Sequence, residues 1–341
     1  MNIKAELPQK LLDREGSLLK PGWANKLIYE YSPFDVKAAN KLRIKEWDYY
    51  AVVDNSGYGF STVIADNRYM GLANCSFFDF NAGKKQSFVT PLIFPMGSLH
   101  MPKDSSKGDI YKRTKYCSIA YIHEQNGRRL TGKYKQCALH GEIEFDIFLE
   151  QNKNDDTMVI ATPWEEDKSA FYYNQKINCM PATGYVKING KTYDFSPDRN
   201  FGTLDWGRGV WTYDNTWYWG SGNGYVNGKR FGYNIGYGFG NTTAASENMI
   251  FYDGKCHKLD RILFDIPENI MQPWRFLSSD GRFDMDFYPV YDNRTNMSAI
   301  FISQNSHQVF GKLYGKAILD DGTALEIKDL LVFAERVRNR Y

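Results

Sequence analysis

The residues best suited to chemistry lie close together, in a segment rich in glycine and tryptophan at positions 198–224. Four of the eight tryptophans fall in this segment: Trp206, Trp211, Trp217 and Trp219. Asp205 stands among them, and a carboxyl group beside apolar rings can keep its proton near neutral pH and give it to a substrate. We therefore predict that Asp205 is a general acid and that the tryptophan ring faces stabilise a developing cation.

Arg208 has two possible relationships to Asp205. A strand over residues 204–213 would place the two side chains on opposite faces, because side chains alternate along a strand. A bulge at Gly207 would bring them to the same face, since glycine inside a strand often marks a bulge. Arg208 would then orient Asp205, hold a polar end of the ligand, or form a purely structural ion pair at a domain junction. Glu247 and Asp198 are the alternative acids.

Residues 231–240 alternate large side chains with Gly or Asn, so a strand here would have one bulky face and one nearly bare face. A bare face indicates that something approaches the backbone closely, either a ligand in a barrel cavity or side chains of a packed sheet. Packing is the commoner reason. Because the segment follows the tryptophan cluster, we nevertheless expect a cavity nearby, with Tyr233 and Asn234 as ligand contacts.

Other kinds of site lack support. The glycines of residues 220–224 precede a strand and not a helix, so they cannot form a phosphate cradle. None of the histidines has zinc-motif spacing: His100, His123, His140, His257 and His307. Ser221 lacks the surroundings of a nucleophile elbow. We expect no metal and no cofactor.

Composition limits the partners and the location. The chain of 341 residues carries 42 Lys and Arg against 40 Asp and Glu, so its net charge of +2 gives no reason to expect nucleic-acid binding. No apolar run is long enough for a membrane span, and residues 1–20 do not resemble a signal peptide. Five cysteines without a CxxC pair fit reduced thiols: Cys75, Cys117, Cys137, Cys179 and Cys256. We expect a soluble cytoplasmic protein whose partner is a small molecule.

The expected fold class is all-β. Aromatic residues, which favour strands, make up 16% of the chain. Short alternating runs recur from about Trp47 onward, separated by Asn-Gly and Asp-Gly turns typical of hairpins. Only residues 35–42 look briefly helical.

The two halves of the chain share an order of elements, which indicates a duplication. The sequence Trp47-Asp-Tyr49, a Gly-Phe strand, Phe77-Phe-Asp79 and Gly83-Lys84 corresponds to Trp217-Tyr-Trp219, residues 231–240, Phe251-Tyr-Asp253 and Gly254-Lys255. Chance matches in an aromatic-rich meander are the alternative. We expect an extended segment at 1–40, a first β-domain at 41–212 and a second at 213–341.

Several motifs resemble one known family, the DUF2804 family. They are Leu11-Leu-Asp-x-x-Gly16, Gly22-Trp-Ala24, Lys45-Glu-Trp-Asp-Tyr-Tyr50, Leu204-Asp-Trp-Gly-Arg-Gly-Val-Trp211, and Glu247-Asn248 followed by Asp253-Gly254. More distantly, such proteins are similar to the group of hydroxyneurosporene synthase, AttH-like proteins and tocopherol cyclase. The resemblance implies two tandem lipocalin-like β-barrels or strongly bent sheets, and a group that contains cofactor-free enzymes which protonate alkenes or promote cyclisation.

Together these features predict a cofactor-independent hydratase, isomerase or cyclase that acts on a largely apolar or aromatic small molecule near the domain junction. Two other classes of function remain open. A non-catalytic carrier would use the same cavity to hold a lipid or pigment. A glycoside hydrolase would use aromatic walls with carboxylates such as Asp198, Asp205 and Glu247.

Overall fold

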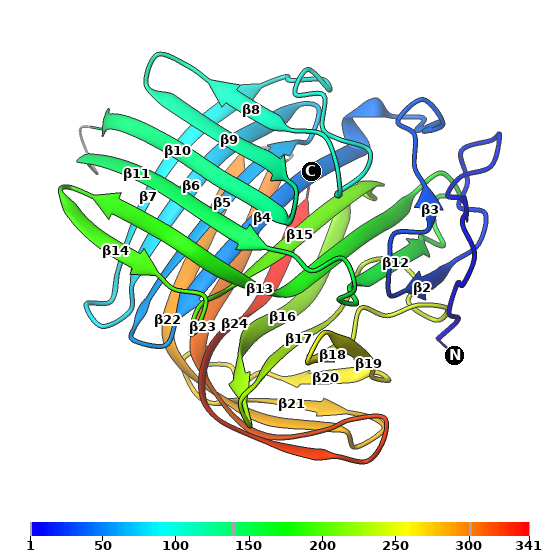
Figure 1. The fold of residues 1–341 in the computed structure, drawn as a ribbon. Coiled ribbons are helices and arrows are strands. Elements are labelled where there is room, and N and C mark those ends of the chain that lie inside the picture. Colours follow the sequence, from blue (N-terminus) through cyan, green and yellow to red (C-terminus); the bar gives the residue numbers. More distant parts are fainter. Residues whose placement is uncertain (1, 138–140, 300–301, 341) are drawn as a thin grey trace.

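The chain consists almost entirely of antiparallel strands in two strongly bent sheets (Figure 1), so the all-β prediction is confirmed. The structure, a computed structural model, describes residues 2–137, 141–299 and 302–340. Within these residues the only helix is the short 3-10 helix η1 (Lys41–Arg43). The rest of the segment at 35–42 has no regular secondary structure, because so short a segment cannot offset the cost of helix nucleation.

The first sheet has 13 strands, most of them in the order β7-β6-β5-β4-β15-β13-β11-β10-β9-β8. Its strands β12 and β14 pair with β13, and β2 pairs with β12. The bounds are β2 (Gly22–Ala24), β4 (Ile44–Asp54), β5 (Tyr58–Asp66), β6 (Met70–Asp79), β7 (Lys84–Ile93), β8 (Ile110–Arg113), β9 (Cys117–Glu124), β10 (Gly127–Cys137), β11 (Gly141–Glu150), β12 (Met158–Pro163), β13 (Phe171–Ile188), β14 (Lys191–Phe195) and β15 (Phe201–Val210).

The second sheet has nine strands in the order β19-β18-β17-β16-β24-β23-β22-β21-β20. The bounds are β16 (Asp214–Val226), β17 (Lys229–Tyr237), β18 (Met249–Tyr252), β19 (Lys255–Lys258), β20 (Ile262–Asp265), β21 (Trp274–Ser278), β22 (Phe283–Ala299), β23 (Ile302–Ile318) and β24 (Ala324–Arg340). The chain passes from one sheet to the other between Val210 and Asp214. We keep 41–212 and 213–341 as our proposal for the domain limits.

The two sheets share one strand order. Apart from β2 of the N-terminal segment, each begins with a four-strand meander, β4 to β7 or β16 to β19, and the first strand of each meander pairs with the last strand of its sheet, β15 or β24. Gly184 and Gly315 even share a detail: both have positive φ (136° and 147°), and a Cβ at either would overlap a carbonyl oxygen of the neighbouring strand, β11 or β22. This correspondence is what tandem copies of one unit would produce.

The N-terminal segment runs alongside both sheets. Strand β2 extends the first sheet through β12, and the amide of Ile3 donates to the carbonyl of Ala244 in the second half at 2.7 Å. Strands β1 (Gln9–Lys10) and β3 (Tyr29–Glu30) form a separate parallel pair. Figure 1 shows this segment, in dark blue, beside β12.

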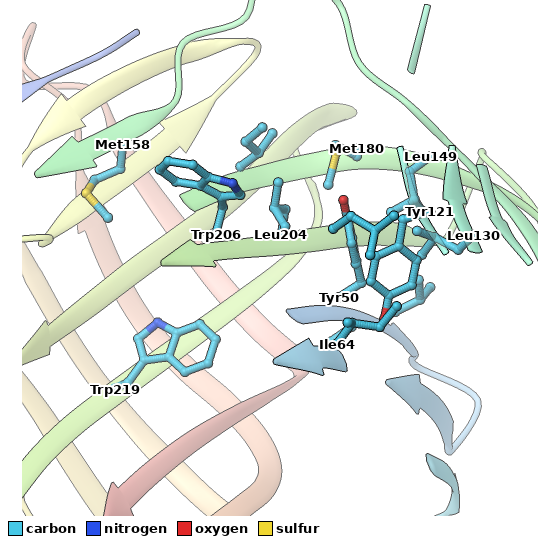
Figure 2. Close-up of a cluster of buried hydrophobic side chains, with 14 of the residues drawn as sticks. Tyr50, Ile64, Tyr121, Leu130, Leu149, Met158, Met180, Leu204, Trp206 and Trp219 are labelled. Atoms are coloured by element: carbon cyan, nitrogen blue, oxygen red, sulfur yellow. The ribbon is translucent and has the colours of Figure 1, made fainter. Parts of the chain in front are cut away.

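Alternation decides which face of each strand is buried. In β11 the buried residues are every second one: Ile143, Phe145, Ile147 and Leu149. Strand β15 differs, because all ten of its residues are buried. One face of β15 packs into the core of the first sheet, part of which Figure 2 shows, and the other faces the second sheet. At the junction between the sheets, β15 therefore turns a row of buried side chains toward the second sheet.

Candidate functional site

Two equivalent rows of side chains meet at the junction. In the first sheet, Tyr49, Asp205 and Lys176 lie side by side on β4, β15 and β13. In the second sheet, Trp219, Glu335 and Gln308 lie side by side on the corresponding strands β16, β24 and β23. Because strand pairing fixes both registers, each sheet contributes one acidic residue at the same place in its fold.

The rows also contact each other across the junction. The amide of Gln308 donates to the hydroxyl of Tyr49 at 3.2 Å, and the ammonium of Lys176 lies 3.8 Å from the centre of a Trp219 ring. The rings of Tyr49 and Trp219 meet edge to face. The aromatic residue of each row, Tyr49 or Trp219, thus contacts the polar residue at the end of the other row, Gln308 or Lys176.

Between the sheets lies a cavity of about 300 Å³. Its polar lining comes mainly from the two rows and from amides, and its apolar lining comes from aromatic rings. The lining residues are Lys45, Trp47, Tyr49, Val63, Ala65, Asn67, Tyr172, Lys176, Asp205, Trp211, Trp217, Trp219, Phe239, Gln304, Gln308, Glu335 and Asn339.

Asp205 is held by two donors from β13. The ammonium of Lys176 lies 2.8 Å from its carboxylate, and the Asn174 side chain donates to the same oxygen at 2.6 Å. Lys176 is 1% exposed. A buried ammonium needs a counter-charge, and Asp205 supplies it. The contacts of Asp205 are therefore those of an ion-pair partner, and its role as a proton donor stays a prediction.

Glu335 is a buried carboxyl group beside aromatic rings, which is the setting that the sequence suggested for Asp205. Burial raises the pKa of its carboxyl group to about 7, although the Trp217 indole N–H, which donates to it at 3.0 Å, and the nearby Lys176 act in the opposite direction. The negative charge of Asp205 adds to the rise. A carboxyl group that titrates near neutral pH can both give and take a proton under physiological conditions.

Glu247 lies behind the cavity wall and not in its lining. It is 1% exposed, and burial raises its pKa to about 7, although a hydrogen bond from the Asn234 side chain acts in the opposite direction. Lys176, Asp205 and Glu335 all act on this pKa electrostatically, so Glu247 belongs to the same charged cluster. Its carboxyl group occupies the space that a Cβ at Gly236 would need.

Three of the four expected tryptophans line the cavity: Trp211, Trp217 and Trp219. Trp211 contacts both Trp217 and Trp47 edge to face, with ring centres 5.4 Å and 5.8 Å apart. Gly207 leaves room for this arrangement, since a Cβ there would overlap the Trp47 ring.

The structure places Trp206 and Arg208 on the opposite face of β15. Pairing of β15 with β4 is regular from Phe201 to Val210, so there is no bulge at Gly207. Arg208 donates to Asp48 at 2.9 Å and to the carbonyl of Pro102, and its guanidinium stacks 4.3 Å from the Trp206 ring. The open question about Arg208 is answered: it does not pair with Asp205. In Figure 2, Trp206 and Trp219 lie well apart.

The remaining candidates fall outside the cavity. Asp198 is exposed and accepts from the Ser196 hydroxyl. Tyr233 is buried against Phe283 in the core of the second sheet. Asn234 supports the site indirectly, because it accepts from the Trp219 indole N–H at 2.7 Å.

The bare face of residues 231–240 is filled by protein. Cys179 occupies the space beside Gly232, and Glu247 that beside Gly236. Packing is therefore the reason for these glycines, as favoured from the sequence.

The whole chain matches one protein family. The family model, described as a domain of unknown function (DUF2804), covers residues 2–341. The chain belongs to the DUF2804 family. The resemblance stated from its motifs is thereby confirmed. No curated protein matches the chain.

Solved structures similar to this DUF2804 chain are distant. Kievitone hydratase from Nectria haematococca is 10% identical, with 98% of each chain covered and a TM-score of 0.46. An AttH-like protein from Nitrosomonas europaea is 13% identical, with 90% of this chain and 95% of that chain covered and a TM-score of 0.45. CghA is 11% identical, with 97% of each chain covered and a TM-score of 0.38. These similarities are too weak to assign an activity.

Sequence reasoning missed two central residues of this DUF2804 site, Lys176 and Glu335. The usable signal for Glu335 was an acidic residue that interrupts an apolar run, Leu330-Leu-Val-Phe-Ala334 followed by Val337. Lys176 similarly follows the aromatic stretch Phe171-Tyr-Tyr173. Neither residue could be placed near Asp205 from the sequence, because that requires knowing which strands pair.

Other features of the DUF2804 chain limit the alternatives. A larger cavity, about 700 Å³, lies along β17 and β20 but contains none of the expected site residues. In the described ranges, His, Cys, Asp and Glu side chains nowhere gather in threes suited to a metal, and no helix is long and apolar enough to cross a membrane. Four cysteines are free thiols: Cys75, Cys117, Cys179 and Cys256. The side chain of Cys137 and all of His140 lie outside the described residues.

Proposed function

We propose that this protein is a cofactor-independent acid/base enzyme that adds a proton to an apolar or aromatic small molecule in the junction cavity. The supporting observation is Glu335, a carboxyl group with a pKa of about 7 that lines a cavity walled by tryptophans. An acid with a pKa near the working pH is the most effective proton donor, because it is both protonated and strong enough to transfer the proton.

Glu335 would transfer its proton to a carbon of a substrate double bond. The resulting cation would be captured by water in a hydratase, lose a neighbouring proton in an isomerase, or be attacked by a second double bond in a cyclase. In each case the carboxylate left at Glu335 recovers a proton from water or from the product. No redox step occurs, so the chemistry needs only the side chains of the cavity.

Asp205 takes a different role from the one expected from the sequence. Ion-paired with Lys176 at 2.8 Å, it would act as a fixed negative charge that favours a cationic intermediate. The ring faces of Trp211, Trp217 and Trp219 would add to this effect, since a cation over an aromatic face is stabilised by roughly 0.5–2 kcal/mol.

The proposal is tested in two steps. Native mass spectrometry of the purified protein would first identify a retained small molecule. Candidate alkenes of that class would then be incubated with the protein in D₂O, and deuterium incorporation at carbon would be measured. We expect incorporation with the wild-type protein and a loss of about 10²- to 10⁴-fold in Glu335→Gln. A retained lipid or pigment that never exchanges would instead favour a carrier.

A glycoside hydrolase is the second candidate, supported by two carboxyl groups in different surroundings, Glu335 and Asp205. Burial raises the pKa of Glu335 to about 7, which suits a general acid, while Asp205 lies 2.8 Å from the Lys176 ammonium and would serve as the second carboxylate. Tryptophan faces also suit sugar rings. A bound sugar in the native mass spectrum, or hydrolysis of aryl glycosides that is lost in Glu335→Gln, would favour this class over the first.

A further inference from the structure

One end of the junction cavity lies away from its two acids and near the ends of the sheets. On β4, Tyr49 is opposite Asp205, whereas Lys45 is opposite Gly209, close to the end of β15. On β24, Asn339 lies beyond Glu335, next to the last described residue. We call this end of the cavity its mouth. The lining residues there are Lys45, Asn67, Gln304 and Asn339.

Both sheets meet the protein surface at the mouth. Arg43 directly precedes β4, and its guanidinium lies 4.9 Å from the centre of the Tyr213 ring. The guanidinium of Arg340, the residue after Asn339, lies 5.5 Å from the same ring. The Arg340 side chain is 51% exposed. The mouth is therefore bordered by solvent-exposed ends of both sheets.

An apolar loop at residues 93–96 adjoins the mouth. Its side chains Ile93, Phe94 and Met96 are 83%, 63% and 50% exposed. The amide of Phe94 donates to the carbonyl of Tyr69 at 3.0 Å, so the loop lies on the turn that follows Asn67 of the cavity lining. Contiguous exposed side chains of this size mark an interaction surface.

The apolar loop is held in a costly conformation. Phe94 and Met96 have φ values of 47° and 52°, in the left-handed region that large side chains avoid. The amide of Met96 donates to the carbonyl of Arg68 at 3.0 Å, and that of Gly97 donates to the Asp66 carboxylate at 2.9 Å. Such strain persists only where the surroundings fix it, so the exposure of these side chains is built into the fold.

The other neighbours of the mouth are mostly basic. Lys45 connects the apolar loop to η1, because its amine lies 4.4 Å from the centre of the Tyr69 ring and 3.5 Å from the Leu42 carbonyl. The basic groups in η1 and at the end of β24 are Lys41, Arg43, Arg338 and Arg340. Asp214 pairs with the last two at 3.0 Å and 3.5 Å and offsets one of these charges. Apolar tips beside a basic rim complement an anionic lipid surface.

Strand β7, which leads into the apolar loop, is protected against pairing with a second copy of the chain. It is an edge strand, and an exposed edge can take up a further strand. Lys84, Lys85 and Pro91 lie along it, and such residues are the usual protection of an edge. Lipid is therefore a better occupant of this region than a second copy.

We propose that the apolar loop inserts into the surface of a bilayer that contains anionic phospholipid. The basic groups beside the mouth would contact the phosphate headgroups, while Ile93, Phe94 and Met96 enter the boundary between headgroups and acyl chains. The mouth then faces the bilayer, and an apolar molecule can reach the cavity without passing through water. This docking goes beyond the proposed function and does not require a proton transferred by Glu335.

The test measures co-flotation of the purified full-length protein with extruded vesicles. We expect the protein to float with phosphatidylcholine vesicles that contain about 30% phosphatidylglycerol and to bind phosphatidylcholine alone much more weakly. Raising the salt from about 0.05 M to 0.5 M should weaken the binding, because salt screens exposed charges. Glu335→Gln should float as wild type does, so failure of this proposal is distinguishable from failure of the proposed function.

A triple variant removes the apolar side chains of the loop: Ile93→Ser, Phe94→Asn and Met96→Asn. Asparagine is used at the two left-handed positions because it tolerates them. We expect the partition coefficient to fall on the order of 10²-fold. The matched control removes exposed apolar side chains of the second sheet that do not line the cavity: Leu263→Ser, Met271→Ser and Val290→Ser. It should bind as wild type does, and near-UV circular dichroism checks the folding of both variants.

Three results would overturn the proposal: no flotation of the wild-type protein, equal flotation of the triple variant and wild type, or an equal loss in the control variant. Light scattering on the same samples tests the second-copy alternative. A dimer that is lost in the triple variant, from a protein that does not float, would assign the apolar loop to self-association instead.

Discussion

The guanidinium of Arg208 donates to the carboxylate of Asp48 at 2.9 Å, on the face of β15 turned away from the junction cavity. Both side chains are almost fully buried. Burial raises the pKa of Asp48, and Arg208 is the main group that opposes this rise. The pair thus belongs to the interior of the first sheet.

Asp48→Asn should therefore lower stability without changing the cavity. It leaves a buried guanidinium without its counter-charge, and we expect a loss of about 3–5 kcal/mol in the free energy of urea unfolding. Asp214→Asn, which breaks an exposed pair with Arg338, is the matched control and should change stability little. Equal stability of Asp48→Asn and wild type would contradict this assignment.

Asp205 and Lys176 should show strong coupling in a double-mutant cycle. Asp205→Asn leaves a buried ammonium, and Lys176→Met leaves a carboxylate without its partner, so each should be destabilising. The double variant should lose less than the sum of the two, by about 1–3 kcal/mol. Urea unfolding of all four proteins measures this difference. Additive losses would mean that the 2.8 Å contact contributes nothing.

Glu247 should make the folded protein less stable as the pH rises. Its pKa is raised from an ordinary 4.5 to about 7, so the folded state binds more protons than the unfolded state between these values. Stability from this group is complete below about pH 4.5 and is lost as the pH passes 7. Glu247→Gln should match wild type at pH 4.5 but exceed it at pH 8 by roughly 3 kcal/mol. Parallel stability curves for the two proteins would refute this.

Two substitutions should move the pKa of Glu335 in opposite directions. Trp217→Phe removes the indole donor that lowers this pKa, so the value should rise above 7. Asp205→Asn removes a negative charge that raises it, so the value should fall. Carboxyl ¹³C NMR titration, with the signal assigned through Glu335→Gln, would measure both shifts. Shifts of the same sign would show that the immediate neighbours do not control this group.

Gly207→Ala should disturb the aromatic wall. The new Cβ would overlap the Trp47 ring, so either the ring or the strand must move. We expect a loss of about 1–3 kcal/mol and a change in tryptophan fluorescence. Gly220→Ala is the control, because its new Cβ would lie 3.2 Å from the nearest atom, in the Ile235 side chain, instead of overlapping a ring. If Gly220→Ala were the more disruptive change, this packing argument would fail.

Local sequence predicted the half of the site that lies in one stretch of chain. Asp205, Trp211, Trp217 and Trp219 occupy β15, β16 and the short connection between them, so they are close in the chain where it passes from one sheet to the other. Strand alternation puts Trp206 on the far face, and the structure agrees with that geometry although the residue type suggested a ligand contact.

The other half of the site depends on strand pairing over long distances. Lys176 and Glu335 reach the cavity because β13 pairs with β15 and β24 pairs with β16. Such pairings follow from the complete topology and cannot be read from a short window. The ion pair of Asp205 also depends on these pairings, because its partner Lys176 lies on the neighbouring strand and not on the same strand.

The pairing of β16 with β24 also constrains how the protein can fold during synthesis. Strand β16 can pair with β17 at once, but Asp214 is opposite Arg340, so its second neighbour, β24, is synthesised more than a hundred residues later. The first sheet faces a similar delay, because β4 pairs with the much later β15. The ribosome therefore releases Asp205 and its tryptophans long before Glu335 can join them. Until then these buried-type surfaces remain uncovered, and this is the stage at which we expect the nascent chain to depend most on chaperones.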